Sequence, residues 1–331
     1  LDSRKDAPAA LEYFVTVDCE QSIQLGDGMT ARYIPAGHLL GAAQISLNVD
    51  GIKVHFSGDL GHDRDPLMQP PKPFPGADVL VCESTYGNRK HPDTDPEAEL
   101  APVLKRVFGR GGSVLVPSFA VGRAQGLMYH IARLMNRGEV PYVPVYLNSP
   151  MAVDATDIYH RHHDEHRVSW EDCVAMFRLA KRVNTVEQSK ELNTRRGPMI
   201  IISASGMLTG GRILHHLVSF GGDRRNAIVL SGFQAGGTRG AALAAGERKL
   251  RIFGQDRQIE AEVVQLETFS GHADADEILR WMQAGRVPKM TYLTHGEPEA
   301  ADTLRRRVAH ELGRAARVPE HLDTVRLDAP Q

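Results

Sequence analysis

The segment Ile52-Lys53-Val54-His55-Phe56-Ser57-Gly58-Asp59 joins a short run containing β-branched residues to a small, polar ending. Such a run is typical of a β-strand that stops at a turn. Six further runs end in the same way, at residues 78–82, 113–116, 143–147, 199–202, 227–230 and 290–293. Amphipathic stretches lie between them, among them residues 97–108, 124–135, 276–282 and 299–312. The alternation of strands and helices predicts an α/β fold.

Composition narrows the class of protein further. The chain has 331 residues, of which 42% are apolar and 24% charged, which is enough for one large or two ordinary globular domains. Its 39 basic and 41 acidic residues give a net charge of -2, so any contact with nucleic acid must be local. Three cysteines without CxxC spacing suit a reducing compartment. Since no apolar run is long enough to span a membrane, we expect a cytoplasmic protein without a membrane segment.

Ligands of open α/β sheets gather beyond the carboxyl ends of strands, so the polar strand endings are the first candidates for chemistry. His38 and His295 each follow an extended run next to a glycine, and Asp59 closes the segment quoted above. Histidine and carboxylate ligands suit zinc, and a bridging aspartate holds two cations together. Spacing alone also allows the alternative that Asp59 is a turn or capping residue.

Glu83 and His272 are candidates for proton transfer. A carboxylate that hydrogen-bonds an imidazole fixes its tautomer and makes it a competent general acid. Alternatively, Glu83 caps a helix or turn, and His272 belongs to the cap of the helix predicted at residues 276–282.

Seven short motifs follow one another along the chain: Ala36-Gly37-His38, Phe56-Ser57-Gly58-Asp59, Glu83-Ser84-Thr85-Tyr86-Gly87, Pro117-Ser118-Phe119-Ala120-Val121-Gly122-Arg123, Ser203-Ala204-Ser205-Gly206-Met207, Ser270-Gly271-His272-Ala273-Asp274 and His295-Gly296-Glu297. Their types and order resemble the metallo-β-lactamase-fold RNA nucleases that carry a β-CASP insertion. That group includes bacterial and archaeal RNA-processing exonucleases and the endonuclease of eukaryotic pre-mRNA 3′-end formation. The resemblance runs from about residue 30 to residue 309.

The resemblance implies a metallo-β-lactamase αββα sandwich, incomplete at its N-terminus, with an inserted α/β β-CASP domain. The lactamase domain would comprise residues 1–87 and 251–331, and the insertion residues 88–250. His38 would ligate one zinc ion, His295 the other, and Asp59 would bridge the two. Glu83 and His272 would form the acid pair, with His272 protonating the leaving oxygen.

One departure from the family concerns the metal ligands. The signature His-x-His-x-Asp-His, which supplies four of them, does not occur in this sequence. A histidine cluster at residues 160–166 lies within the predicted insertion, where it forms either a separate metal site or a solvated helix face. Because the chain opens near the family's third metal motif, we expect an upstream segment in the natural protein. A stand-alone chain of these residues is then expected to fold poorly, bind zinc weakly and leave RNA uncleaved.

Contacts with RNA phosphates are expected from the insertion. Ser118 and Arg123 lie where a strand ends and a helix begins, a favourable place for an anion. Ser203, Ser205 and Gly206 offer a second group of hydroxyl and amide donors, and Ser270, beside His272, completes the set. Alternatively, Gly206 makes a turn and Arg123 pairs with a carboxylate.

The leading hypothesis is a zinc-dependent ribonuclease that hydrolyses single-stranded RNA in RNA processing or decay. One alternative is a catalytically inactive RNA-binding or partner-docking platform of the same family. Another is a small-molecule metallo-hydrolase on the same fold. The sequence leaves open whether cleavage is exo- or endonucleolytic, whether RNA is preferred over DNA, and whether the protein is a monomer or a homodimer.

Overall fold

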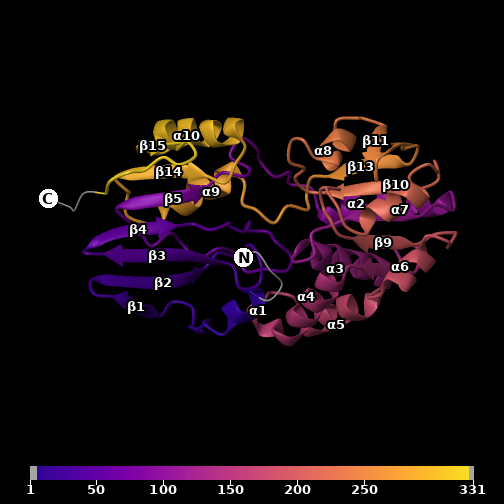
Figure 1. Cartoon of the computed structure of the whole chain (residues 1–331), viewed down its shortest axis with the longest axis horizontal. Coiled ribbons are helices and arrows are strands. Elements are labelled where there is room, and N and C mark those ends of the chain that lie inside the picture. The colour runs from indigo at the N-terminus through magenta and orange to yellow at the C-terminus, as the bar shows by residue number, and fades with distance from the viewer. Residues whose placement is uncertain (1–5, 328–331) are drawn as a thin grey trace.

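The computed structural model describes residues 6–327 and shows two lobes side by side (Figure 1). Both ends of the described chain build the first lobe, and the middle of the chain builds the second. No helix in the described part of the chain is long and apolar enough to cross a membrane. Helix α1 (Asp6–Leu11) lies between the two lobes (Figure 1). The elements of the first lobe are β1 (Ser22–Gly26), β2 (Met29–Pro35), β3 (Ala43–Val49), β4 (Ile52–Phe56), β5 (Val79–Glu83), α9 (Ala275–Gln283), β14 (Met290–Thr294), α10 (Pro298–Leu312) and β15 (Ala316–Arg317).

The first lobe is built on a seven-stranded sheet of order β1-β2-β3-β4-β5-β14-β15. Strands β1 to β4 are antiparallel neighbours, whereas β4, β5, β14 and β15 run parallel. Helix α9 is strongly amphipathic, and its apolar residues Ile278, Leu279 and Met282 are buried in a cluster with Leu80 and Leu293 of the sheet. This packing fixes the parallel half of the sheet, whose strand ends carry the candidate residues.

The second lobe surrounds a six-stranded parallel sheet of order β13-β10-β6-β9-β7-β8. Successive residues of one strand face opposite sides: Val114 and Val116 pack in one core cluster and Leu115 in the other. Helices cover both faces, which explains why the strands β6, β7, β9 and β10 are buried along their whole length. Its elements are α2 (Pro96–Gly109), β6 (Val114–Pro117), α3 (Arg123–Asn136), β7 (Val145–Asn148), α4 (Pro150–Arg161), a 3₁₀ turn (His163–Glu165), α5 (Trp170–Leu179), β8 (Ala180–Arg182), α6 (Val186–Leu192), β9 (Ile200–Ser203), α7 (Ile213–Phe220), β10 (Ala227–Ser231), α8 (Arg239–Ala244), β11 (Lys249–Ile252), β12 (Gln255–Gln258) and β13 (Glu262–Leu266).

The α/β class is confirmed, and each of the seven predicted strands occurs within two residues of its expected bounds. The predicted return to the first lobe at residue 251 is wrong. Strand β13 pairs in parallel with β10, so the second lobe continues to Leu266. Leu250 and Ile252 of the β11–β12 hairpin also pack in a core cluster of the second lobe. The boundary was misplaced because β13 contains the polar residues Glu262 and Gln265, unlike the mainly apolar strands β6, β9 and β10 beside which it belongs.

Candidate active site at the edge of the first sheet

Three candidate residues follow neighbouring strands of the first sheet. Strands β4, β5 and β14 lie next to one another and run parallel. Asp59 follows β4 after a two-residue turn, Glu83 is the last residue of β5, and His295 directly follows β14. Because the carboxyl ends of parallel strands meet at one edge of a sheet, the three side chains gather there.

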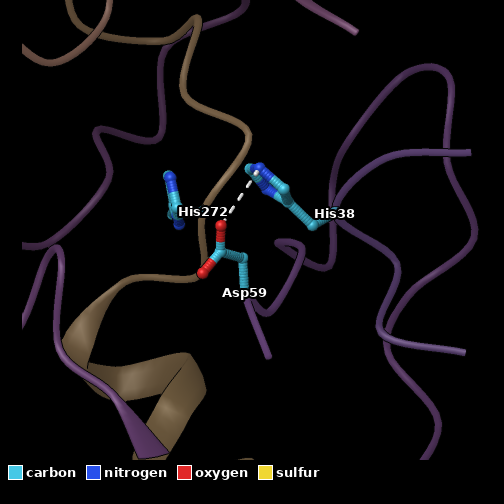
Figure 2. Close-up of side chains that lie close together, drawn as sticks. All are labelled: His38, Asp59 and His272. Atoms are coloured by element: carbon cyan, nitrogen blue, oxygen red, sulfur yellow. Dashed lines mark ion pairs between the residues drawn. The ribbon is translucent and has the colours of Figure 1, made fainter. Parts of the chain in front are cut away.

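His38 and Asp59 face each other across this edge, as Figure 2 shows. His38 Nε2 lies 4.0 Å from Asp59 Oδ2. The other ring nitrogen, Nδ1, lies 2.8 Å from the carbonyl oxygen of Gly271 and donates to it. That hydrogen bond leaves the lone pair of Nε2 pointing at the aspartate, which is the tautomer of a metal-ligating histidine. Burial and the neighbouring His272 lower the pKa of His38, so its ring is held neutral.

His295 approaches the other oxygen of the same carboxylate. Its Nδ1 lies 3.1 Å from Asp59 Oδ1, and its side chain is 59% exposed. The adjacent Gly296 packs so closely on Ser84 that a Cβ there would lie 2.5 Å from the Ser84 carbonyl oxygen. A side chain at position 296 would therefore push the His295 loop away from the sheet. Asp59 thus has one histidine on each oxygen.

Glu83 and His272 form a buried pair beside these residues. Glu83 Oε2 lies 3.1 Å from His272 Nδ1, and the carboxylate also accepts from the backbone amide of Leu60. Burial opposes ionisation of Glu83, but the hydrogen bonds from His272 and Leu60 outweigh it, and the pKa of the carboxyl falls below its ordinary value. The carboxylate therefore accepts a proton-bearing Nδ1 and leaves Nε2 of His272 facing the site.

Asp274 and His91 fix the backbone around His272, so the His272 side chain takes no part in capping the helix. Asp274 caps α9 and forms a capping box with Glu277. His91 donates from Nε2 to the carbonyl oxygen of His272 at 2.8 Å, and its backbone amide donates to Asp274. The helix cap proposed as an alternative role for His272 thus belongs to Asp274.

His38, Asp59 and His272 each offer one ligand atom within 4.8 Å of the others, the one such group in residues 6–327. The ring centroids of His38 and His272 are 4.3 Å apart, and those of His272 and His295 are 6.1 Å apart. His38, Asp59 and His295, the predicted ligands, are likewise two imidazoles and one carboxylate, and such donors suit zinc. The residues present therefore fit the metal that the sequence predicts.

The site opens into a cavity of about 690 Å³ between the two lobes. His38, Asp59, His272 and His295 lie in its wall, together with Arg123 and Ser270 from the predicted phosphate contacts. The Arg123 guanidinium donates to the carbonyl oxygen of Ser231 at 2.6 Å, so it also braces the loop after β10. The alternative pairing of Arg123 with a carboxylate is not what the structure shows.

The other predicted phosphate contacts do not line this cavity. Ser203 is buried, and its hydroxyl donates to the carbonyl oxygen of Asn148 inside the second lobe. Ser118 is also buried, with its hydroxyl on the Phe119 carbonyl oxygen. The prediction for these two serines is wrong, because both side chains are buried and their hydroxyls donate to backbone carbonyl oxygens.

Ser205 and Gly206 serve the local turn. Ser205 Oγ accepts from the backbone amides of Thr209 and Gly210, at 3.1 and 3.3 Å. Gly206 is buried against the Phe119 ring, and a Cβ there would lie 2.9 Å from a ring carbon. The structure therefore supports the alternative that Gly206 makes a turn, and it places neither residue in the cavity.

The histidine cluster at residues 160–166 serves packing. His160 stacks between Trp170 and Phe177, with ring centroids 5.0 and 4.5 Å away. His166 Nε2 donates to the Tyr159 carbonyl oxygen at 3.1 Å. The separate metal site that the sequence left open is absent from the described residues.

The structure adds cavity residues that the sequence analysis missed. Phe119, Met207 and Phe233 follow β6, β9 and β10, three neighbouring strands of the second sheet, and reach the cavity from the side of the second lobe. His130 reaches it from α3. A signal for His130 was present, because Arg123 and His130 are seven residues apart and so share a face of that helix.

Comparisons with known proteins identify two domains in the chain. The Beta-Casp domain matches residues 124–243, which lie in the second lobe. The Zn-dependent metallo-hydrolase RNA specificity domain matches residues 256–319, which include α9, β14 and α10. Both matches agree with the predicted fold, and the second indicates a divalent metal cofactor.

Curated relatives extend the similarity over most of the chain. A ribonuclease of Thermus thermophilus is 37% identical over 305 residues, which are 89% of this chain and 69% of the relative. An RNase J-like protein of Methanocaldococcus jannaschii is 29% identical, over 88% of this chain and 70% of its own length. The transcription termination factor FttA of Methanosarcina mazei is 29% identical over 96% of this chain, which spans only 53% of that relative.

A solved structure supports the fold alone. The crystal structure of a protein of unknown function from Enterococcus faecalis aligns with a TM-score of 0.50 at 12% identity, over 92% of this chain and 65% of that one. The Thermus relative exceeds 30% identity over more than two thirds of its length. Together with the two matched domains, it shows that this chain belongs to the metallo-β-lactamase-fold RNA nucleases with a β-CASP insertion.

Proposed function

We propose that the natural protein is a zinc-dependent ribonuclease that hydrolyses phosphodiester bonds of single-stranded RNA, and that it holds two zinc ions. The observation that carries this proposal is the placement of Asp59. Its two oxygens face histidines on opposite sides, His38 at 4.0 Å and His295 at 3.1 Å. A carboxylate placed in this way is suited to bridge two cations.

Different residues of this chain would bind the metal and transfer the proton during hydrolysis. His38, Asp59 and His295 would hold the metal. When bound, the metal would lower the pKa of a coordinated water toward ~7 and neutralise charge on the phosphate. Nε2 of His272 faces the site and would deliver a proton to the leaving oxygen. Glu83 behind it stabilises the charged imidazole before the transfer and fixes the tautomer.

RNA is the substrate that the cavity and the relatives favour. The matched RNA specificity domain and the names of the ribonuclease relatives support RNA over a small molecule. With a net charge of -2 the chain has no general attraction for nucleic acid, so the contacts must be local, and the cavity offers a place for them. Arg123 supplies a cation in its wall, and Phe119 and Phe233 supply faces on which bases stack.

We also propose that the protein works in the cytoplasm. Cys82 and Cys173 are buried free thiols and Cys19 is an exposed one. Unpaired cysteines suit a reducing compartment.

The test is cleavage of a labelled single-stranded RNA by the zinc-loaded natural protein. We expect cleavage that a chelator abolishes and that zinc restores. Asp59→Ala should abolish it, whereas Asp256→Ala, an exposed acid on the β11–β12 hairpin, should leave it unchanged. Metal-independent cleavage, or cleavage that survives Asp59→Ala, would contradict the proposal.

A further inference from the structure

His130 is a buried polar side chain that the reaction described above does not use. It lies on α3 in the wall of the cavity and is only 6% exposed. Its Nδ1 lies 3.1 Å from Glu97 Oε1. Its Nε2 has no hydrogen-bond partner among residues 6–327, although the rest of the ring is enclosed. A nitrogen left free in the wall of a cavity is available to a ligand.

The charges around Glu97 fix which nitrogen of His130 carries the proton. Glu97 is buried and accepts from Arg133 Nε at 2.8 Å and from Arg137. Burial opposes its ionisation, but Arg137, His130 and Arg133 outweigh it, so the pKa of Glu97 lies below its ordinary value. A carboxylate only accepts hydrogen bonds, so Nδ1 of His130 must be the donor.

The imidazole of His130 is therefore a neutral ring that lines the cavity, and its acceptor, Nε2, is left free by the contacts of the ring with the protein. Burial lowers its pKa, and the opposing effect of Glu97 does not restore it. The ring is locked by edge contacts with Tyr129 and Phe269, at centroid distances of 5.1 and 5.3 Å. Nε2 thus presents a lone pair in a fixed place.

A fixed acceptor selects the part of a nucleotide that can bind it. Phosphate oxygens are acceptors themselves and cannot donate to Nε2. The ribose 2′-hydroxyl can donate, is present on every RNA nucleotide and is missing from DNA. Base amino groups also donate, but they differ from one base to the next.

We propose that His130 Nε2 accepts a hydrogen bond from the 2′-hydroxyl of one nucleotide in the cavity, and that this contact makes the site favour RNA over DNA. Arg123 lies on the same face of α3, about 10 Å along the helix axis. It offers a cation to a phosphate of the same strand. The inference rests on the proposed function, since it assumes that RNA occupies the cavity.

The experiment measures the binding of RNA oligonucleotides in which one nucleotide at a time carries 2′-fluoro in place of 2′-hydroxyl. Fluorine keeps the size of the group but cannot donate. All proteins carry His272→Ala, which slows cleavage of the RNA so that its binding can be measured. His130→Phe keeps a ring of similar size and removes the acceptor, whereas His130→Gln returns an amide oxygen. His215→Phe, at an exposed histidine against Phe253, is the matched control.

With His130 present, we expect one position of the RNA at which 2′-fluoro weakens binding about three- to tenfold, as for one net hydrogen bond. His130→Phe should bind unmodified RNA more weakly by the same factor and lose the sensitivity at that position. His130→Gln should recover part of the affinity and part of the sensitivity to 2′-fluoro. His215→Phe should bind as the parent protein does. A scan that is identical with and without His130 would overturn the inference, as would a parent scan in which 2′-fluoro weakens binding at no position. Failure of the parent to bind any RNA would instead contradict the proposed function.

Discussion

Glu83 Oε2 lies 3.1 Å from His272 Nδ1, although 189 residues separate the two in the sequence. Glu83 ends a central strand of the first sheet, and His272 lies just before α9, which packs on that sheet. The pair is therefore assembled only when the chain returns from the second lobe. Its geometry suits a proton donor held by a carboxylate, although a metal-ligating histidine also commonly has such a partner.

Replacing His272 separates these two roles. His272→Ala in the natural protein should lower the turnover of RNA by ~10² to 10⁴, the usual contribution of a general acid, while the zinc content stays the same. Single-turnover cleavage and elemental analysis of one preparation give both values. Loss of one zinc ion in the variant would make His272 a ligand, and wild-type cleavage would mean that the proton comes from elsewhere.

Arg123 should contribute to RNA binding through charge. Its guanidinium lies in the cavity wall and is held there by the Ser231 carbonyl oxygen. Arg123→Ala should weaken binding and flatten its salt dependence, since one phosphate contact fewer releases fewer counterions. Binding titrations at several salt concentrations measure the slope. Equal slopes for variant and wild type would show that Arg123 only braces the loop after β10.

His216 should make the second lobe sensitive to acid. It is fully buried, donates from Nδ1 to Asn193 at 2.7 Å and meets the Asn148 amide at Nε2. Burial, with the charges of His215 and Arg212, lowers its pKa to about 4 from an unfolded value of 6.5. The unfolded state therefore binds the proton first as the pH falls. The contribution of the neutral His216 to the free energy of unfolding is therefore fully present above pH 6.5. It is lost as the pH falls from 6.5 towards 4, and the loss amounts to about 3 kcal/mol.

Urea denaturation at pH 7.5 and pH 4.5 checks this expectation. His216→Gln keeps a hydrogen-bonding side chain that does not titrate. The variant should therefore lose clearly less unfolding free energy than the wild type between the two pH values, even if it is less stable at pH 7.5. An equal loss in both proteins would mean that His216 does not titrate in this range.

The sequence predicted the parts of the fold that depend on local patterns. Strand endings such as Asp59 and Glu83 were readable because an apolar run that stops at a polar residue is a local feature. Strand β13 was missed because its place in the second sheet comes from pairing with β10 and not from its composition. The boundary of the second lobe therefore needed the structure.

The candidate site shows the same division. The motifs placed His38 and His295 at strand ends, but the sequence does not show that they face different oxygens of one carboxylate. Ser203 looked like a phosphate contact because it ends a strand, yet the last residue of a strand points to one face of the sheet. That face is the interior of the second lobe. The role of a strand-end residue thus depends on side-chain direction, which a strand's bounds do not give.

The most direct test of the bridging site is the zinc content of three site variants and one control variant of the natural protein. If Asp59 bridges two ions, Asp59→Ala should lose both, whereas His38→Ala and His295→Ala should each lose one. Asp256→Ala, the matched exposed acid, should keep the wild-type content. Elemental analysis after dialysis against a weak chelator gives these stoichiometries. An Asp59→Ala variant that keeps as much zinc as the two histidine variants, or as much as the wild type, would contradict the bridging site.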